Sequence, residues 1–357
     1  MDTTDPHIRF NERGECNHCE EFLERTSKRL YQGKVSDQQL KTLVEKIKRD
    51  GKSKKYDAVL GLSGGIDSCY AAYHAKKLGL RVLAVHMDNG WNSEEAVKNI
   101  KNVADILDMD YESYVLNWDT FKDLQLTFLK ASVPELETPT DIAIPAALHQ
   151  IASRYGIKYI ISGGNFATEG ILPKSWHYNA KDVTYLKAIH QQFGNQSLKE
   201  FPLFGYKQEF YYKYLRGIRI IYLLNYLPYE KNTAMELLQK ELQWKYYGGK
   251  HYESIYTGFV QSYILPEKFF IDYRKATFST QICVGSMKRE EALHLLQSSP
   301  YENANMEKEK AYVCKKLGIT VEEFNRMMQE QPLTHRHYPN DENLLEWIYG
   351  WYRKLNG

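Results

Sequence analysis

The chain has 357 residues, of which 43% are hydrophobic and 26% charged, the ordinary balance of a globular protein with enough apolar residues for a sizeable core. This length corresponds to about two domains. The net charge of +2 is too small to indicate a nucleic-acid partner. The sequence has no apolar run of about 18 residues, so it predicts no membrane span.

The first 36 residues look irregular and contain one Cys-x-x-Cys pair, Cys16 and Cys19. The start MDTTDPHIRF is polar and acidic, unlike a signal peptide. The whole chain has five cysteines, an odd number that does not suggest a disulfide framework. We therefore expect a cytoplasmic protein.

Strand and helix signals alternate along the next part of the chain, up to Phe166. Ser36 is expected to cap a helix over 37–50 that ends at Gly51. The expected strands cover 56–62, 81–87, 111–116 and 158–162, and the expected helices cover 67–78, 94–107 (capped by Ser93) and 141–155. Short apolar strands separated by helices indicate βαβ units. The predicted fold class is therefore α/β, with a doubly wound parallel sheet.

The pattern changes after Phe166. Residues 183–247 look helical and aromatic, with LRGIRIIYLLNYL as the most apolar piece, and a polar-aromatic block follows. Amphipathic helices are expected around 289–297 and 305–317 and from Thr320 onward. We divide the chain into a Cys-containing segment (1–36), an α/β domain (37–180) and a helical C-terminal region (181–357).

Three polar loops directly follow predicted strands: SGGIDS at 63–68, MDNGW at 87–91 and SGGN at 162–165. In parallel sheets, ligands bind beyond the carboxyl ends of the strands. The three loops should therefore share one edge of the sheet and one cleft.

The SGGIDS loop has the composition of a phosphate cradle. Its glycines let the backbone approach a ligand closely, and the following helix adds the positive end of its dipole. Ser63 and Ser68 can donate hydrogen bonds to phosphate oxygens, whereas Asp67 is suited to Mg²⁺ bound to the phosphates. The loop lacks the Walker pattern. The alternative is a tight turn with a capping Ser or Asp.

This loop resembles the signature of the PP-loop ATP pyrophosphatases, which include asparagine synthetase, GMP synthetase, NAD synthetase and tRNA-thiolating enzymes. The resemblance implies a PP-loop (HUP-like) sheet, ATP with Mg²⁺, and adenylation of a substrate oxygen. Pyrophosphate is then released and a nucleophile displaces AMP. The ATP-binding residues that it implies are Leu62, Ser63, Gly64, Gly65, Asp67, Ser68, Asp88 (with Asn89), Gly164 and Asn165.

Residues 250–293, together with the stretch from Asp141 through ISGGNFATEG, resemble the N-acetyl sugar amidotransferases. This resemblance implies conversion of an acetamido group of a nucleotide-linked or nonulosonic sugar into an acetamidino group, in the biosynthesis of lipopolysaccharide O-antigen. Charge builds on the ATP phosphates during such a reaction, so cations and Mg²⁺ should surround them. The candidate catalytic residues are Asp67, Lys250, His251, Glu253, Arg274 and Lys275, and the candidate substrate residues are Asp272 and Tyr273.

The nitrogen source is expected to lie on another chain. No Gly-x-Cys-x-Gly elbow of a class I glutaminase is present, and Met1 is followed by Asp2 rather than by a cysteine nucleophile. The resemblance implies ammonia from a separate class I (HisH-like) glutaminase subunit. A homo-oligomer is also compatible with the sequence.

The Cys16–Cys19 pair resembles half of a Cys₄ zinc site, whose other pair would precede DTTDPHIRF in the family. A structural zinc site needs four ligands. Three explanations stay open: the given sequence begins after the first pair, this chain has lost the site, or His7, His18 or a distant cysteine completes it.

Two other functions remain open at this stage. A tRNA-thiolating enzyme would also use a PP-loop, but it should show catalytic cysteines near the loop or strong basic patches. A nucleotide-sensing module would keep the cradle without chemistry and would release no pyrophosphate.

Overall fold

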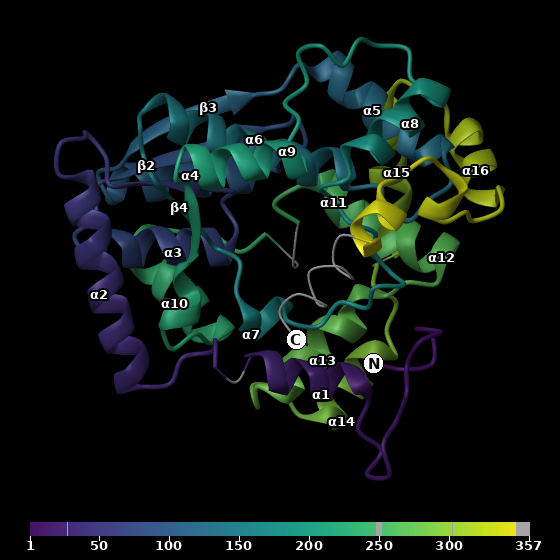
Figure 1. Ribbon diagram of the computed structural model, residues 1–357. Coiled ribbons are helices and arrows are strands. Elements are labelled where there is room, and N and C mark those ends of the chain that lie inside the picture. The colour runs from purple at the N-terminus through teal and green to yellow at the C-terminus, as the bar shows by residue number, and fades with distance from the viewer. Residues whose placement is uncertain (27, 248–251, 302, 348–357) are drawn as a thin grey trace.

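The computed structural model describes residues 1–26, 28–247, 252–301 and 303–347 (Figure 1). Within these residues, one parallel sheet has five strands in the order β3-β2-β1-β4-β5. The strands are β1 (Ala58–Gly61), β2 (Val82–Asp88), β3 (Asp110–Val115), β4 (Tyr159–Ser162) and β5 (Arg219–Tyr222). The predicted α/β fold is confirmed. The strand order reverses between β1 and β4, and in such sheets this is the point where ligands bind.

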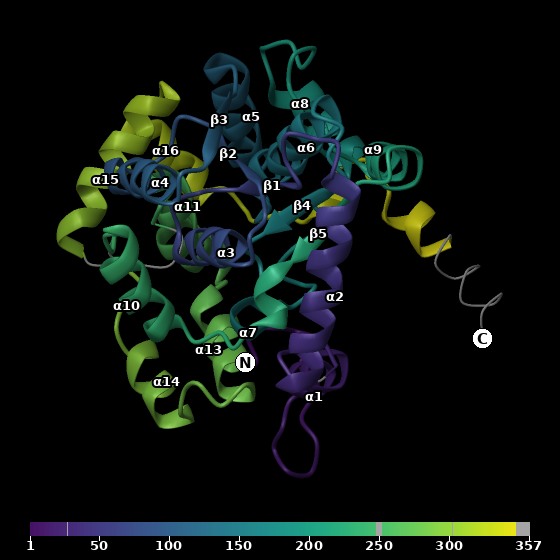
Figure 2. The ribbon, with the colours of Figure 1, turned by 90° about the vertical axis from the view of Figure 1, so that its left-hand side faces the viewer.

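Helices cover both faces of the sheet, and alternate strand residues point to each face. Leu60 points to the face covered by α3 (Ile66–Lys77) and α4 (Glu94–Ile106). Helices α2 (Lys34–Gly51) and α10 (Lys231–Leu242) pack in the same hydrophobic cluster. Val59 packs on the other side, against α6 (Thr138–Arg154). Figure 2 shows α3 and α6 on opposite sides of the strands. The sheet is therefore doubly wound.

The fifth strand was not predicted. The apolar piece LRGIRIIYLLNYL was interpreted as helical, but its centre forms β5, which pairs with β4 from Tyr159↔Arg219 to Ser162↔Tyr222. Gly217 has a φ of +68°, which ends the preceding helical turn. The β-branched pair Ile220 and Ile221 then favours an extended chain. The sheet thus draws its last strand from beyond residue 180.

A helical region completes the molecule on one side of the sheet (Figure 1). Its core is aromatic and includes the buried side chains of Trp91, Phe121, Phe128, Tyr256 and Phe259. Its helices are α5 (Trp118–Lys130), α7 (Phe166–Glu169), α8 (Val183–Phe193), α9 (Tyr206–Phe210), α11 (Ile255–Phe259), α12 (Leu265–Phe269), α13 (Tyr273–Cys283), α14 (Arg289–Leu296), α15 (Asn303–Leu317) and α16 (Val321–Gln329). Short π-helical turns cover Tyr211–Leu215 and Val260–Ile264, and 3₁₀ turns cover Leu223–Tyr226 and His335–His337.

Two of the predicted helix starts are confirmed and two are wrong. Ser93 caps α4 by accepting from the N–H of Ala96, and Thr320 caps α16 with a capping box, as expected. Ser36 lies inside α2 instead of capping it, because the helix begins at Lys34 after Gly33. Helix α6 begins at Thr138, three residues before the expected start, and α5 was not predicted.

The N-terminal segment 1–26 packs beside α13 through α1 (Asn17–Thr26). The amino group of Met1 donates to Ser279 Oγ at 2.5 Å, and Lys275 pairs with Asp2 at 2.7 Å. Phe22 is buried in the aromatic core of the helical region. The segment therefore braces the helix whose other residues line the cavity described below.

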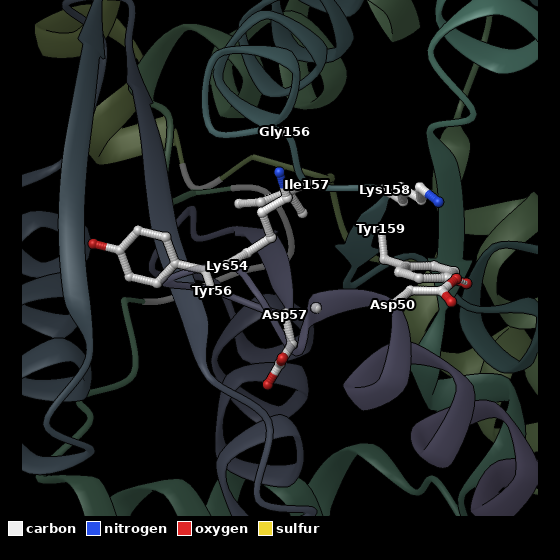
Figure 3. A pocket seen from close by; sticks show the side chains of 9 residues that line it. Asp50, Lys54, Tyr56, Asp57, Gly156, Ile157, Lys158 and Tyr159 are labelled. Carbon is white, nitrogen blue, oxygen red and sulfur yellow. Dashed lines mark hydrogen bonds between the residues drawn. The ribbon is translucent and has the colours of Figure 1, made fainter.

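Charged groups close the end of the sheet opposite the polar loops. Asp57 pairs with Arg81 at 2.5 Å, and Asp50 accepts from the hydroxyl of Tyr159 at 2.6 Å. Figure 3 shows Asp50 beside Tyr159 and Asp57 at the start of β1, around a shallow pocket. These groups fasten the amino ends of the strands.

Over the part of the chain that the structure describes, no helix combines the length and the hydropathy needed to span a bilayer.

Candidate nucleotide and substrate site

A cavity of about 1330 Å³ lies at the carboxyl ends of β1, β2 and β4. One wall comes from the loops after these strands, including Ser63, Asn89 and Gly164. The facing wall comes from the helical region, including Glu253 and Tyr273. The structure therefore brings the polar loops to one cleft, as the sequence predicts.

The loop after β1 is shaped by glycine. Gly64 has a φ of +83°, and a Cβ there would lie 2.5 Å from the carbonyl oxygen of Ala96 in α4. A Cβ on Gly163, in the loop after β4, would lie 2.7 Å from the amide nitrogen of Ser68. These positions admit no side chain, since real Cβ contacts are longer. The loops after β1 and β4 thus touch backbone to backbone at the first turn of α3.

The two serines of the loop bond to the loop itself. Ser68 Oγ accepts from the Ser63 N–H at 3.2 Å, and Ser63 Oγ accepts from the Gly65 N–H at 3.3 Å. Both distances are at the long end of the hydrogen-bond range. An anion that accepted from the same N–H groups would replace weak contacts with charge-assisted ones. The geometry therefore fits a phosphate cradle.

Asp67, in the first turn of α3, lines the cavity and accepts a hydrogen bond from the hydroxyl of Tyr229. Burial and the neighbouring Asp67 carboxylate raise the pKa of Tyr229, so the phenol stays a donor. Behind the loop, the indole of Trp244 donates to the Gly64 carbonyl at 2.9 Å. Sequence reasoning missed both aromatic residues, because neither belongs to a motif.

The loop after β2 is organised around Asn92. Its amide lies 2.9 Å from His86 Nε2 and donates to Asp88 Oδ1 at 3.2 Å. His86 is buried, which lowers its pKa, and its Nδ1 lies 3.1 Å from the Leu62 carbonyl. Asn89 and Asn92 line the cavity, whereas the Asp88 carboxylate caps its own turn by accepting from Gly90 at 2.9 Å.

The loop after β4 contributes Gly164 to the cavity wall. Asn165 is buried and caps α7 through the Thr168 N–H at 3.0 Å. Its side-chain nitrogen has no partner among the residues described. Asn165 thus supports the loop from behind.

The segment that begins at Glu253, here called the C-terminal block, docks onto the loop after β2. The Ser93 N–H donates to the Glu253 carbonyl at 2.8 Å, and the Ile255 N–H donates to the Trp91 carbonyl at 2.9 Å. A Cβ on Gly65 would lie 3.3 Å from Glu253 Oε1 and 3.3 Å from the Tyr247 hydroxyl. Glu253 therefore stands over the phosphate loop, close to the region of Asp67.

The predicted cationic residues separate into three groups. Lys250 and His251 lie outside the described residues. Arg274 lines the cavity and pairs with Asp272 at 2.7 Å, and Asp272 caps α13 and does not line the cavity. Lys275 is absent from the cavity wall and pairs with Asp2 instead. One cation that the sequence reasoning missed, Lys231 at the start of α10, lines the cavity near Tyr229.

An acidic group faces Tyr273 in the helical wall. Burial raises the pKa of Glu135 to about 7 and that of Glu137 to about 8, with Asp141 adding to the second shift. Burial and the same three carboxylates raise the pKa of Tyr273. All four side chains line the cavity. The glutamates were missed because burial in a loop leaves no periodic signal in a sequence.

The Cys16 and Cys19 thiols lie 3.4 Å apart, and Cys19 also interacts with Cys283 of α13, which lowers the pKa of Cys283. His18 contacts Asp5 at 2.5 Å. Across residues 1–26, 28–247, 252–301 and 303–347, no group of three or more His, Cys, Asp or Glu side chains is placed to hold a metal ion. The structure therefore gives no support to the expected zinc site. A Mg²⁺ ion bound through ATP phosphates needs only one or two carboxylates, so Asp67 and Glu253 still fit that role.

Two family models match the chain. One, described as "LPS biosynthesis protein WbpG-like, C-terminal domain", matches residues 253–355. The other, described as "NAD synthase", matches residues 36–132.

A curated relative, the probable mitochondrial tRNA-specific 2-thiouridylase 1 of Caenorhabditis elegans, is 27% identical over 161 residues. The match covers 41% of this chain and 41% of that protein. Among solved structures, NMN synthetase from Francisella tularensis aligns with a TM-score of 0.31 at 15% identity, covering 61% of this chain and 99% of that one. The NH3-dependent NAD synthetase from Campylobacter jejuni aligns with a TM-score of 0.30 at 16% identity, covering 57% and 83%.

The NAD synthase match includes the Ser63–Ser68 loop, and the WbpG-like match includes Glu253, Tyr273 and Arg274 in the facing wall. Sequence matches and site geometry thus point to the same cavity.

Proposed function

We propose that the protein is an ATP-dependent amidotransferase that converts the acetamido group of an activated amino sugar into an acetamidino group, in the biosynthesis of a surface polysaccharide such as lipopolysaccharide O-antigen. One observation carries the proposal. The phosphate loop and the WbpG-like region form opposite walls of one cavity, which is large enough for a nucleotide and a sugar together.

The chemistry follows from the placement of the side chains. The Ser63–Ser68 loop and the positive end of α3 hold the pyrophosphate portion of ATP. Mg²⁺, when bound with ATP, offsets phosphate charge, and Asp67 and Glu253 are the residues that would hold it. The acetamido oxygen attacks the α-phosphorus and pyrophosphate leaves. AMP then becomes the leaving group when ammonia attacks the imidate carbon.

We further propose that a separate class I glutaminase supplies the ammonia. The sequence has no Gly-x-Cys-x-Gly elbow, and among the residues that the structure describes, no cysteine lines the cavity. The proposal therefore assigns glutamine hydrolysis to the partner subunit.

The partial match to a tRNA-specific 2-thiouridylase favours tRNA thiolation as a second candidate function. Thiolation through a cysteine persulfide would need a thiol at the activated carbon. Cys69 is fully buried in α3, and Cys16, Cys19 and Cys283 gather around α1. The positions of these cysteines thus support the amidotransferase over the tRNA-thiolating enzyme.

The test is pyrophosphate release from MgATP with ammonium chloride and a panel of nucleotide-linked acetamido sugars and nonulosonic acids, followed by mass spectrometry of the sugar. An amidino product about one mass unit lighter, formed with AMP, supports the proposal. A parallel reaction offers tRNA in place of the sugars. Pyrophosphate release with unchanged sugars and a thiolated tRNA would replace the proposal with the tRNA-thiolating enzyme. The Asp67→Ala variant should release no pyrophosphate, since it lacks the Mg²⁺ ligand, while keeping a cooperative fold.

A further inference from the structure

Two glutamates at the start of α6, Glu135 and Glu137, line the cavity on its helical side. Glu135 accepts from the Tyr178 N–H at 3.2 Å and from the Tyr185 hydroxyl at 3.0 Å. Glu137 Oε2 accepts from the Thr257 hydroxyl at 2.6 Å. Within the described residues, these partners are all neutral. A pair of buried carboxylates without a cationic partner is costly when ionised, so each stays protonated up to its raised pKa and, above that pH, favours a bound cation.

Unpartnered polar atoms mark where that cation would sit. Glu137 Oε1 is buried and has no hydrogen-bond partner among the described residues. The hydroxyl of Thr138 also lacks one, although this cavity-lining residue is only 1% exposed. The Tyr256 hydroxyl, which interacts electrostatically with Glu137, is unpartnered too at 1% exposure. Unpaired polar atoms at this depth are rare in folded proteins and call for an explanation.

The set of atoms selects the kind of cation. Among residues 1–26, 28–247, 252–301 and 303–347, no three His, Cys, Asp or Glu side chains are placed to hold a metal ion, so the site lacks a ligand set of the zinc type. One carboxylate oxygen and two hydroxyl oxygens instead suit a small cation that donates several hydrogen bonds. Ammonium is such a cation, and the proposed reaction consumes its conjugate base.

We infer that Glu137 and Thr138 of the cavity wall, together with the buried Tyr256 hydroxyl next to Glu137, form an ammonium pocket, and that Glu137 takes a proton from the bound ammonium to release ammonia for attack on the adenylated substrate. The role in attack rests on the proposed function, whereas the binding does not.

The pocket is connected to the nucleotide side of the cavity. The Thr257 hydroxyl that bonds to Glu137 lies 3.0 Å from Ser254 Oγ. Ser254 forms a β-bridge with Asn92 in the loop after β2. Glu137 is therefore held by the same segment that docks the C-terminal block onto the nucleotide loops.

The proton and bond balance is simple. Ammonium gives one proton to the Glu137 carboxylate and becomes ammonia. The nitrogen lone pair forms the new bond to the imidate carbon while the carbon–oxygen bond to AMP breaks. The acetamido N–H proton leaves to solvent when the oxygen is adenylated, so the imidate nitrogen carries no proton. The amidinium product then holds the three protons of ammonia, and Glu137 returns its own proton to solvent after product release. Burial raises the pKa of Glu137 to about 8, closer to that of an amine than an ordinary glutamate, which favours this transfer.

The first test measures binding without ATP or sugar. Thermal unfolding of the full chain is compared in ammonium chloride, sodium chloride and potassium chloride at equal ionic strength, above the pKa of Glu137, about 8. Ammonium alone should raise the midpoint, because it binds the folded state, and Glu137→Gln and Thr138→Val should remove this shift. Equal shifts with potassium, or an ammonium shift that survives in both variants, would overturn the inference.

The second test measures catalysis. Thr138→Val should raise the KM for ammonium by about tenfold or more through the lost hydrogen bond, with the KM for ATP unchanged. Glu112→Gln, in β3 and outside the cavity wall, is the acidic control for Glu137→Gln and should change neither constant. An unchanged ammonium KM in Thr138→Val would contradict the inference. If no sugar is amidinated but the ammonium-specific shift is present and lost in Glu137→Gln, the proposed function fails and the binding inference stands.

Discussion

Gly64 shows how one residue fixes the geometry of the phosphate loop. Its φ of +83° lies in the left-handed region, and its α-carbon stands so close to the Ala96 carbonyl that a methyl group would lie 2.5 Å from the oxygen. The backbone conformation and the contact with α4 therefore make two separate demands on the same residue. Trp244 adds a third restraint by bonding to the Gly64 carbonyl.

We expect Gly64→Ala to destabilise the fold more than Gly217→Ala. Gly217 also has a positive φ, +68°, but a Cβ there would meet nothing within 4 Å, so Gly217→Ala should cost only the conformational strain of about 1–2 kcal/mol. Gly64→Ala adds the collision with Ala96 and should also abolish pyrophosphate release. Urea unfolding of both variants measures the difference, and equal losses would show that the contact with α4 is unimportant.

The raised pKa values of the cavity glutamates predict a pH dependence of stability. Glu137 has an ordinary pKa of 4.5 when unfolded and about 8 when folded, so the folded state binds more protons between these values. The contribution of Glu137 to the free energy of unfolding should therefore fall as pH rises from about 5 to about 8. The Glu137 contribution should be on the order of a few kcal/mol.

Denaturant unfolding of the wild type and Glu137→Gln across this pH range tests the contribution. The variant has no titrating group at this position, so its stability should fall less steeply. Parallel curves would mean that Glu137 does not titrate as described. Glu135, with a pKa of about 7, adds a slope of the same sign in both proteins.

At the scale of elements, α4 links the two walls of the site. Its capping residue Ser93 accepts from the Ala96 N–H at 3.2 Å and donates its own N–H to the Glu253 carbonyl. The Ala96 carbonyl in turn lies against Gly64. One helix start thus contacts both the phosphate loop and the C-terminal block.

Ser93→Ala should cost about 1 kcal/mol of stability through the lost cap and should also slow pyrophosphate release. Thr320→Ala is the matched control, since Thr320 caps α16 with a capping box away from the cavity. It should cost a similar amount of stability without affecting the reaction. Calorimetry and a pyrophosphate assay separate the two effects, and equal activity in both variants would argue against the coupling through α4.

The elements also show what the sequence could and could not predict. The strand–loop–helix at SGGIDS was predictable because glycines, serines and an apolar strand stand next to one another in the chain. Strand β5 was not, because its extended form depends on pairing with β4 across a long segment. Tyr229 and Trp244 reach the loop by tertiary packing, and the burial that shifts the pKa of Glu137 comes from segments distant in sequence.

At the scale of the molecule, the α/β domain and the helical region share one core. Trp91 from the loop after β2 stacks on Tyr256 of α11 with ring centroids 5.1 Å apart, and both side chains are buried in one cluster with Phe259. Separating the two regions would expose these aromatic side chains to solvent.

We therefore expect the full chain to unfold in a single calorimetric transition. MgATP should raise the midpoint of that transition, since it binds the folded state. Two resolved transitions, with only one shifted by MgATP, would show that the regions are energetically independent despite their common core.

The backbone contact between Gly163 and the first turn of α3 also bears on how molecules enter and leave the cavity. The loop after β4 meets the first turn of α3 without room for a single methyl group between them. We therefore expect this rim of the cavity to be rigid. The opposite wall rests on side-chain packing and on a few backbone hydrogen bonds near Ser93 and Trp91. Substrate entry and product release then depend on movement of the helical wall. The rate at which that wall opens would limit turnover whenever the chemistry at the loop is faster.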